Sequence, residues 1–121
     1  MHELSIADAI VAIAAEHAEG RRVAVVEVKI GHLRQVVPDA LAFAFDLVAE
    51  GTPVAGAELK IEHIEARVAC RRCAAECRVT EFPLVCASCN SLDVDVIAGD
   101  ELLVESLELE EEAGAIAGMR R

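Results

Sequence analysis

The stretch Cys70-Arg-Arg-Cys73, followed after twelve residues by Cys86-Ala-Ser-Cys89, decides the fold of this chain. Two Cys-x-x-Cys pairs separated by a short loop have the spacing of a zinc ribbon. Each tight turn lets two thiolates point at one ion, and two such turns supply the four soft ligands of a closed tetrahedral site. We therefore expect these cysteines to bind one metal ion, with zinc as the first candidate.

The same four cysteines could instead form a redox dithiol or a pair of disulfides. A single Cys-x-x-Cys is enough for redox work, and nothing in the sequence indicates secretion. A closed four-thiolate site is structural, because catalytic zinc keeps one position open for water. Few large apolar residues lie between the two pairs, so we expect metal binding, at about 10–16 kcal/mol, to fold this segment.

The composition narrows the classes of protein. The 121 residues have the size of one domain, or of a small domain that carries a metal-held insertion, and 22 acidic residues against 11 basic ones give a net charge of -11. This charge disfavours nucleic acid and anionic membranes as partners. The chain has neither a signal-peptide pattern at its start nor an apolar run of membrane-spanning length, and its five cysteines fit a reducing compartment, so a cytoplasmic location is expected.

Helical periodicity marks two segments. Residues 5–19 predict a helix with a capping box formed by Ser5 and Asp8 and a stop at Gly20. Pro38 begins a second helix that ends near Gly51. The apolar positions of these helices are Leu4, Ala7, Val11 and Ala14 in one row, Ile6, Ile10 and Ile13 in an adjacent row, and Leu41, Ala44, Phe45 and Val48 in the second helix.

Period-two alternation marks the strands, at residues 22–31, 58–66, 92–96 and 101–109. The strand at residues 58–66 leads directly to Cys70. The sequence thus predicts an α+β fold, in which a three-stranded sheet carries two helices on one face and a zinc ribbon is inserted before the last strand.

Four other polar segments or residues are candidate sites: the chain start, His32, His63 and Cys77. The amine of Met1, the amide and imidazole of His2, and Glu3 could chelate Ni(II) or Cu(II), although a histidine near a chain start is commonly only solvated. For His32 and His63 we expect surface or satisfied polar roles, and for Cys77 an inert or surface thiol. No catalytic grouping or phosphate-binding loop is found in the sequence, so we expect a protein that is not an enzyme.

Taken together, several segments resemble the HypA/HybF family of nickel metallochaperones, over residues 1 to about 110. These segments are Met1-His-Glu-Leu-Ser-Ile6, Val26-Glu-Val-Lys-Ile-Gly31, Val37-Pro-Asp-Ala-Leu-Ala-Phe-Ala-Phe45, the two cysteine pairs, Cys89-Asn-Ser91 and Gly99-Asp-Glu-Leu-Leu-Val-Glu-Ser106. Two positions depart from the family pattern. His32 replaces the usual Glu after the first strand, and Val37 stands where some relatives supply an acidic ligand, so that role is not transferred.

The resemblance implies nickel binding by Met1, His2 and Glu3, and structural zinc at Cys70, Cys73, Cys86 and Cys89. It implies delivery of nickel to the hydrogenase large subunit, in some organisms to urease, with a nucleotide-hydrolysing partner, HypB. The expected domains are a nickel-binding α/β domain (1–66 and 98–112), a zinc ribbon (67–97) and a disordered tail (113–121), in a monomer or a homodimer. The main alternative is a zinc-ribbon adaptor that docks proteins without transferring nickel.

Overall fold

The structure, a computed structural model, describes residues 2–110, so the tail expected at 113–121 lies outside the described residues. In chain order the elements are α1 (Glu3–Ala18), β1 (Val23–Gly31), the 3-10 helix η1 (His32–Arg34), α2 (Pro38–Ala49), β2 (Glu58–Ile64), β3 (Ala66–Cys70), β4 (Glu76–Val79), β5 (Val94–Ala98) and β6 (Leu102–Leu109).

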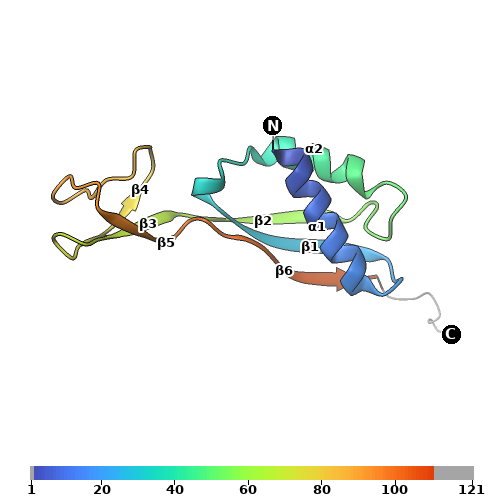
Figure 1. Cartoon of the computed structure of the whole chain (residues 1–121). Helices are drawn as coiled ribbons and strands as arrows, with labels where there is room; N and C mark the ends of the chain where they lie inside the picture. Colours follow the sequence, from blue (N-terminus) through green and yellow to red (C-terminus); the bar gives the residue numbers. More distant parts are fainter. Residues whose placement is uncertain (1, 111–121) are drawn as a thin grey trace. The chain divides into compact units, whose positions relative to one another are not determined.

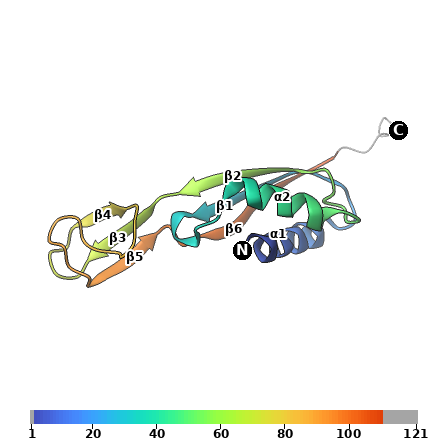
Figure 2. The same ribbon diagram turned by 90° about the horizontal axis from the view of Figure 1, so that it is seen from above.

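These elements form two three-stranded sheets, with strand orders β2-β1-β6 and β4-β3-β5. The chain divides into two compact units. Among the described residues, the first unit, which we call the helical unit, comprises residues 2–27, Val37–Lys60 and residues 104–110. The second, the ribbon unit, comprises Val28–Val36 and Ile61–Leu103. Within the helical unit both helices lie on one face of the strands (Figure 1, Figure 2). The expected α+β fold with an inserted ribbon is confirmed.

Helix α1 begins earlier than predicted. Its first residue is Glu3 and its N-cap is His2, so the capping box expected at Ser5 is wrong. The Ser5 hydroxyl donates back to the His2 carbonyl (3.0 Å), and this bond places Ser5 inside the first turn rather than before it. The end is as expected, because Glu19 and Gly20 both adopt positive φ after Ala18. The predicted apolar face is right except at its margins, where Leu4 and Ile13 are exposed.

Helix α2 and strand β1 follow their sequence patterns. Val37 is the N-cap, Pro38 occupies the first turn and Gly51 with φ +79° lies just past the end. Proline suits the first turn because the N–H that it lacks would have no helical acceptor there. The inward residues of these two elements are buried: Leu41, Ala44 and Phe45 in α2, and Val26, Val28 and Ile30 in β1. The α2 residues and Val26, together with the buried residues of α1, form the apolar core of the helical unit.

The ribbon unit departs most from the predicted elements. The single strand expected at residues 58–66 is two strands, interrupted at Glu65, and β3 belongs to the second sheet. Strand β4 was not predicted, and the strand expected at 92–96 lies at Val94–Ala98. Strand β3 pairs antiparallel with both neighbours, so that Val68 faces Cys77 on β4 and Val96 on β5. No helix among residues 2–110 has the length and apolarity needed to cross a membrane.

The buried core of the ribbon unit is small. It consists of Ala66, Val68 and Val79, with Leu33, Cys77, Leu84 and Val94 packed partly buried against it. Gly99 allows a close approach at this point, because it has φ +107° and a Cβ there would overlap the backbone of Ala66. So few buried side chains leave the sheet dependent on something besides apolar burial.

Candidate metal centres

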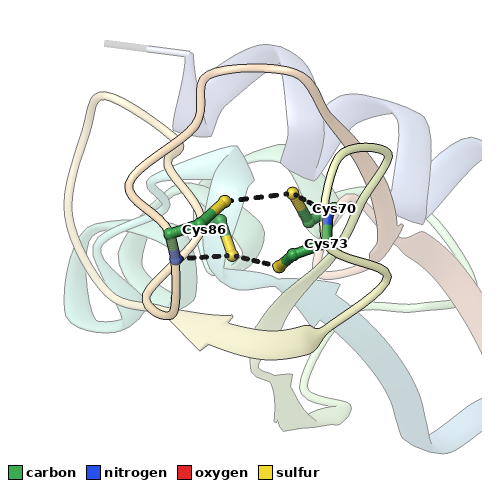
Figure 3. Close-up of side chains that lie close together, drawn as sticks. Cys70, Cys73 and Cys86 are labelled. Carbon is green, nitrogen blue, oxygen red and sulfur yellow. Dashed lines mark hydrogen bonds between the residues drawn. The ribbon is translucent and has the colours of Figure 1, made fainter.

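Four cysteines of the ribbon unit converge on one point. Cys70 ends β3, Cys73 lies in the turn after it, and Cys86 and Cys89 come from the segment between β4 and β5. Figure 3 shows the side chains of Cys70, Cys73 and Cys86 pointing toward one another. The four Sγ atoms all lie within 4.8 Å of one another, and this is the only group of three or more potential metal ligands among the described residues. The two cysteine pairs recognised in the sequence are therefore brought together.

The spacing of the sulfurs fits zinc. Sγ of Cys70 lies 3.6 Å from Sγ of Cys89, and Sγ of Cys73 lies 3.5 Å from Sγ of Cys86. Four sulfurs at about 2.3 Å from a tetrahedral Zn²⁺ are separated by about 3.8 Å. Four soft thiolates, with no position left open, support a structural zinc site rather than a catalytic one.

Hydrogen bonds from backbone amides lower the pKa of two of these thiols, Cys70 and Cys86. Cys70 Sγ accepts hydrogen bonds from the N–H groups of Arg72 and Cys73 (3.3 and 3.4 Å). Cys86 Sγ accepts from those of Ser88 and Cys89 (both 3.4 Å). The Cys73 N–H lowers the pKa of Cys70, and the Cys89 N–H lowers the pKa of Cys86 to about 6. Each Cys-x-x-Cys turn thus stabilises the negative charge of its first sulfur.

Cys89 shows why the group needs a cation. The Ser91 N–H lowers the pKa of its thiol, but the neighbouring thiols, that of Cys70 first, and desolvation raise it by more, to about 12. Adjacent sulfurs cannot all carry negative charge unless a positive ion compensates them. A divalent metal removes this conflict and keeps all four sulfurs deprotonated.

An ion pair closes the ribbon next to the cysteines. The Arg71 guanidinium donates to both carboxylate oxygens of Asp95, and to Asp93 Oδ1 at 3.3 Å. Arg71 N–H also donates to the Asp93 carbonyl (3.0 Å). The pKa of Asp95 is lowered, chiefly by its hydrogen bond with Arg71. These bonds join the first cysteine turn to the start of β5.

Cys77 lies outside the four-cysteine group. Its half-buried Sγ accepts a hydrogen bond from the Ala87 N–H (3.3 Å), and its side chain packs against the ribbon core. The structure thus places Cys77 on β4, where its side chain contacts the ribbon core and the second cysteine turn.

At the start of the chain, His2 and Glu3 differ in their surroundings. The His2 side chain is exposed, whereas Glu3 is only 6% exposed; Met1 lies outside the described residues. Glu3 Oε2 accepts a hydrogen bond from the Val37 N–H at the start of α2 (3.0 Å). A hydrogen bond from the amino terminus, followed by the Val37 N–H, lowers the pKa of the Glu3 carboxyl to about 2. A carboxylate at this place also compensates the positive end of α2.

Sequence reasoning missed this role of Glu3, because no local signal connects residues 34 positions apart. It also missed the meeting of His32 and His63, whose ring centroids lie 5.4 Å apart in the ribbon unit with the rings nearly perpendicular, at 85°. The replacement of the usual Glu by His32 was the one signal in the sequence that pointed to this place. His17, in the last turn of α1, has a local role, since its Nδ1 donates to the Ile13 carbonyl (2.9 Å).

Comparison with known proteins identifies the family of this chain. The family model described as hydrogenase/urease nickel incorporation, metallochaperone, HypA, matches residues 1–109. The chain belongs to the HypA family. The family consists of metallochaperones that handle nickel, so the resemblance seen in the sequence and the expectation of a protein that is not an enzyme are both confirmed.

The relatives match over almost their full length. The hydrogenase maturation factor HypA of Geotalea uraniireducens is 43% identical over 110 residues, covering 91% of this chain and 100% of that protein. That of a Nostoc species is 42% identical over 111 residues, covering 92% of this chain and 97% of that protein. The solution structure of the Ni metallochaperone HypA from Helicobacter pylori has a TM-score of 0.66 at 27% identity and covers 90% of this chain and 97% of that one.

Proposed function

We propose that this HypA-family chain binds Ni(II) through Met1, His2 and Glu3 and delivers it to the hydrogenase large subunit. Delivery takes place in the cytoplasm, with the nucleotide-hydrolysing partner HypB. The family match supports a role in hydrogenase maturation. The observation that carries the site is the exposed His2 imidazole next to the first turn of α1.

The start of α1 suits a chelate built from backbone nitrogens. The first hydrogen bond of the helix runs from the Ile6 N–H to the His2 carbonyl (3.0 Å), so the amides of His2 and Glu3 precede the first donor of the helical ladder. These amides can lose their protons to a metal without breaking a helical hydrogen bond. The His2 imidazole completes a nitrogen-rich set, which Ni(II) accepts in tetragonal geometry.

The contacts of the Glu3 carboxylate support a role in nickel binding for the backbone of Glu3 rather than for its side chain. Its carboxylate is buried and accepts the Val37 N–H, so using it as a ligand would take an acceptor away from the start of α2. We therefore assign the Glu3 amide nitrogen, rather than its carboxylate, to nickel. The carboxylate then positions the metal-binding segment against α2.

The zinc site has a separate role in this proposal. Cys70, Cys73, Cys86 and Cys89 bind one structural Zn²⁺ that holds the ribbon, residues 67–97, while residues 1–66 and 98–112 form the nickel-binding domain. A closed thiolate cage exchanges its ion slowly, whereas an exposed terminal chelate can pass its ion on. The chain works as a monomer or a homodimer.

Nickel titration of untagged, zinc-loaded protein tests the site. We expect the wild type to bind one Ni(II) per chain. His2→Ala should bind it at least about 100-fold more weakly, and Glu3→Gln should bind it with almost unchanged affinity. His17→Ala is the matched control, because this exposed histidine lies on α1 at the end remote from His2 in sequence. Equal nickel binding by the wild type and His2→Ala would overturn the site.

Nickel transfer tests the delivery step. Nickel-loaded wild type mixed with HypB and the metal-free hydrogenase large subunit should raise hydrogenase activity above that given by His2→Ala. The same assay with metal-free urease decides whether urease is also served. Protein that binds both partners but no nickel would instead be a zinc-ribbon adaptor.

A further inference from the structure

A pair of histidines in the ribbon unit has the properties of a metal site that is separate from both centres above. His32 is the first residue of η1, and its backbone neighbours are fixed by hydrogen bonds to the turn before β6. The Gly31 N–H donates to the Glu101 carbonyl (2.8 Å), and the Leu33 N–H donates to the Gly99 carbonyl (2.7 Å). The position of His32 is therefore set by backbone bonds on both of its sides.

The ring of His32 is fixed as well. Its Nε2 lies 2.9 Å from the Thr80 carbonyl. A carbonyl oxygen only accepts, so Nε2 must carry the proton, and in the neutral ring Nδ1 presents a lone pair. Within residues 2–110, Nδ1 has no hydrogen-bonding partner. A histidine that donates one ring N–H to a backbone carbonyl and keeps its other nitrogen open has the arrangement of a metal ligand with its supporting bond.

His63, near the end of β2, supplies the second ring. The centroids of the His32 and His63 rings are 5.4 Å apart. Two imidazoles bound to one ion with metal–nitrogen bonds of about 2.0–2.1 Å have their centroids about 5 Å apart. His63 is exposed, so its ring can turn by a rotamer change to meet an ion held at His32 Nδ1.

We propose that His32 and His63 together form a second transition-metal site, which binds a divalent ion of the nickel, copper or zinc class through two imidazole nitrogens. Imidazole is a good ligand for each of these ions. With two protein ligands the remaining positions stay with water, so the ion exchanges readily. The site belongs to the ribbon unit and does not depend on the nickel motif at the chain start.

The test uses zinc-loaded, full-length protein that carries His2→Ala, with Ni(II) alone as the probe. Two-dimensional NMR of ¹⁵N-labelled imidazoles follows each histidine during the titration. We expect the His32 and His63 signals to shift or broaden together, at a nickel concentration about tenfold below that needed for His17. His17, exposed and without a histidine partner in the described structure, is the internal control.

A second variant separates a shared ion from two independent histidines. His63→Gln leaves the bond between His32 and Thr80 in place, and it should raise the nickel concentration that affects His32 by about tenfold. The backbone amide spectrum shows that the variant remains folded. The proposal is wrong if His32, His63 and His17 all respond at the same concentration, or if His63→Gln leaves the response of His32 unchanged. Both results are independent of nickel binding at His2.

Discussion

Removal of zinc should unfold the β4-β3-β5 sheet and leave the two helices folded. The strands of this sheet have 5, 4 and 5 residues, and ordering their backbone costs about 1–2 kcal/mol per residue, or about 14–28 kcal/mol. Burial of Val68 and Val79 stabilises the folded sheet by about 1.5–3 kcal/mol each. The apolar core alone therefore cannot hold the sheet, whereas zinc binding supplies about 10–16 kcal/mol.

The assay is the amide NMR spectrum of reduced protein before and after chelation of zinc. The signals of Val68, Val79 and Val96 should collapse to unfolded shifts, while those of Leu41 and Phe45 stay in place. Adding zinc back should restore the ribbon signals. The reasoning is refuted if metal analysis finds no zinc and the three ribbon amides still keep their native shifts.

Three further perturbations test the core, the Glu3 contact and one tight turn. Phe45→Ala should lower the free energy of unfolding, measured in urea, by about 3–5 kcal/mol because the Phe45 side chain is 1% exposed. Phe43 is 68% exposed, so Phe43→Ala should change the same free energy by less than about 0.5 kcal/mol. The pKa of Glu3, lowered to about 2 and so below its unfolded value of about 4.3, means that its contact stabilises the fold above pH 4.3 and is lost as the pH falls through 2. The Val37 amide shift should therefore titrate near pH 2, and a midpoint near 4.3 would contradict this contact. Gly99→Ala should destabilise zinc-loaded protein by about 2 kcal/mol or more, through its φ of +107° and overlap with the first Cα of β3, and an unchanged thermal midpoint would contradict it.

The parts of the fold that could be predicted from sequence are those governed by local rules. Helix α2 was located by Pro38 and Gly51, β1 by its alternating residues, and the four-cysteine group by its spacing. In each case the deciding chemistry lies within a few residues of the position that it explains. Local reasoning is strong there because helix ends and Cys-x-x-Cys turns are themselves local structures.

Where the prediction failed, residues distant in sequence decide the structure. Helix α1 begins at Glu3 rather than after Ser5, and the Glu3 carboxylate accepts a hydrogen bond from the Val37 N–H. Strand β4 has a single buried residue, Val79, and forms through pairing with β3, so its own residues carry little alternation. The contact of His32 with His63 likewise depends on how the 3-10 helix is tied to the turn before β6. Pairing of distant residues leaves no periodic trace in a single sequence.

The central claim is that nickel binds at the chain start through the terminal amine, the backbone amides and the His2 imidazole. The most direct measurement compares Ni(II) affinity between untagged protein and the same protein acetylated at its amino terminus, both loaded with zinc. Acetylation leaves every side chain in place but removes the terminal amine as a ligand. We predict one tightly bound nickel in the untagged protein and a loss of affinity of about 100-fold in the acetylated one. Equal affinity in both proteins would show that nickel binds elsewhere.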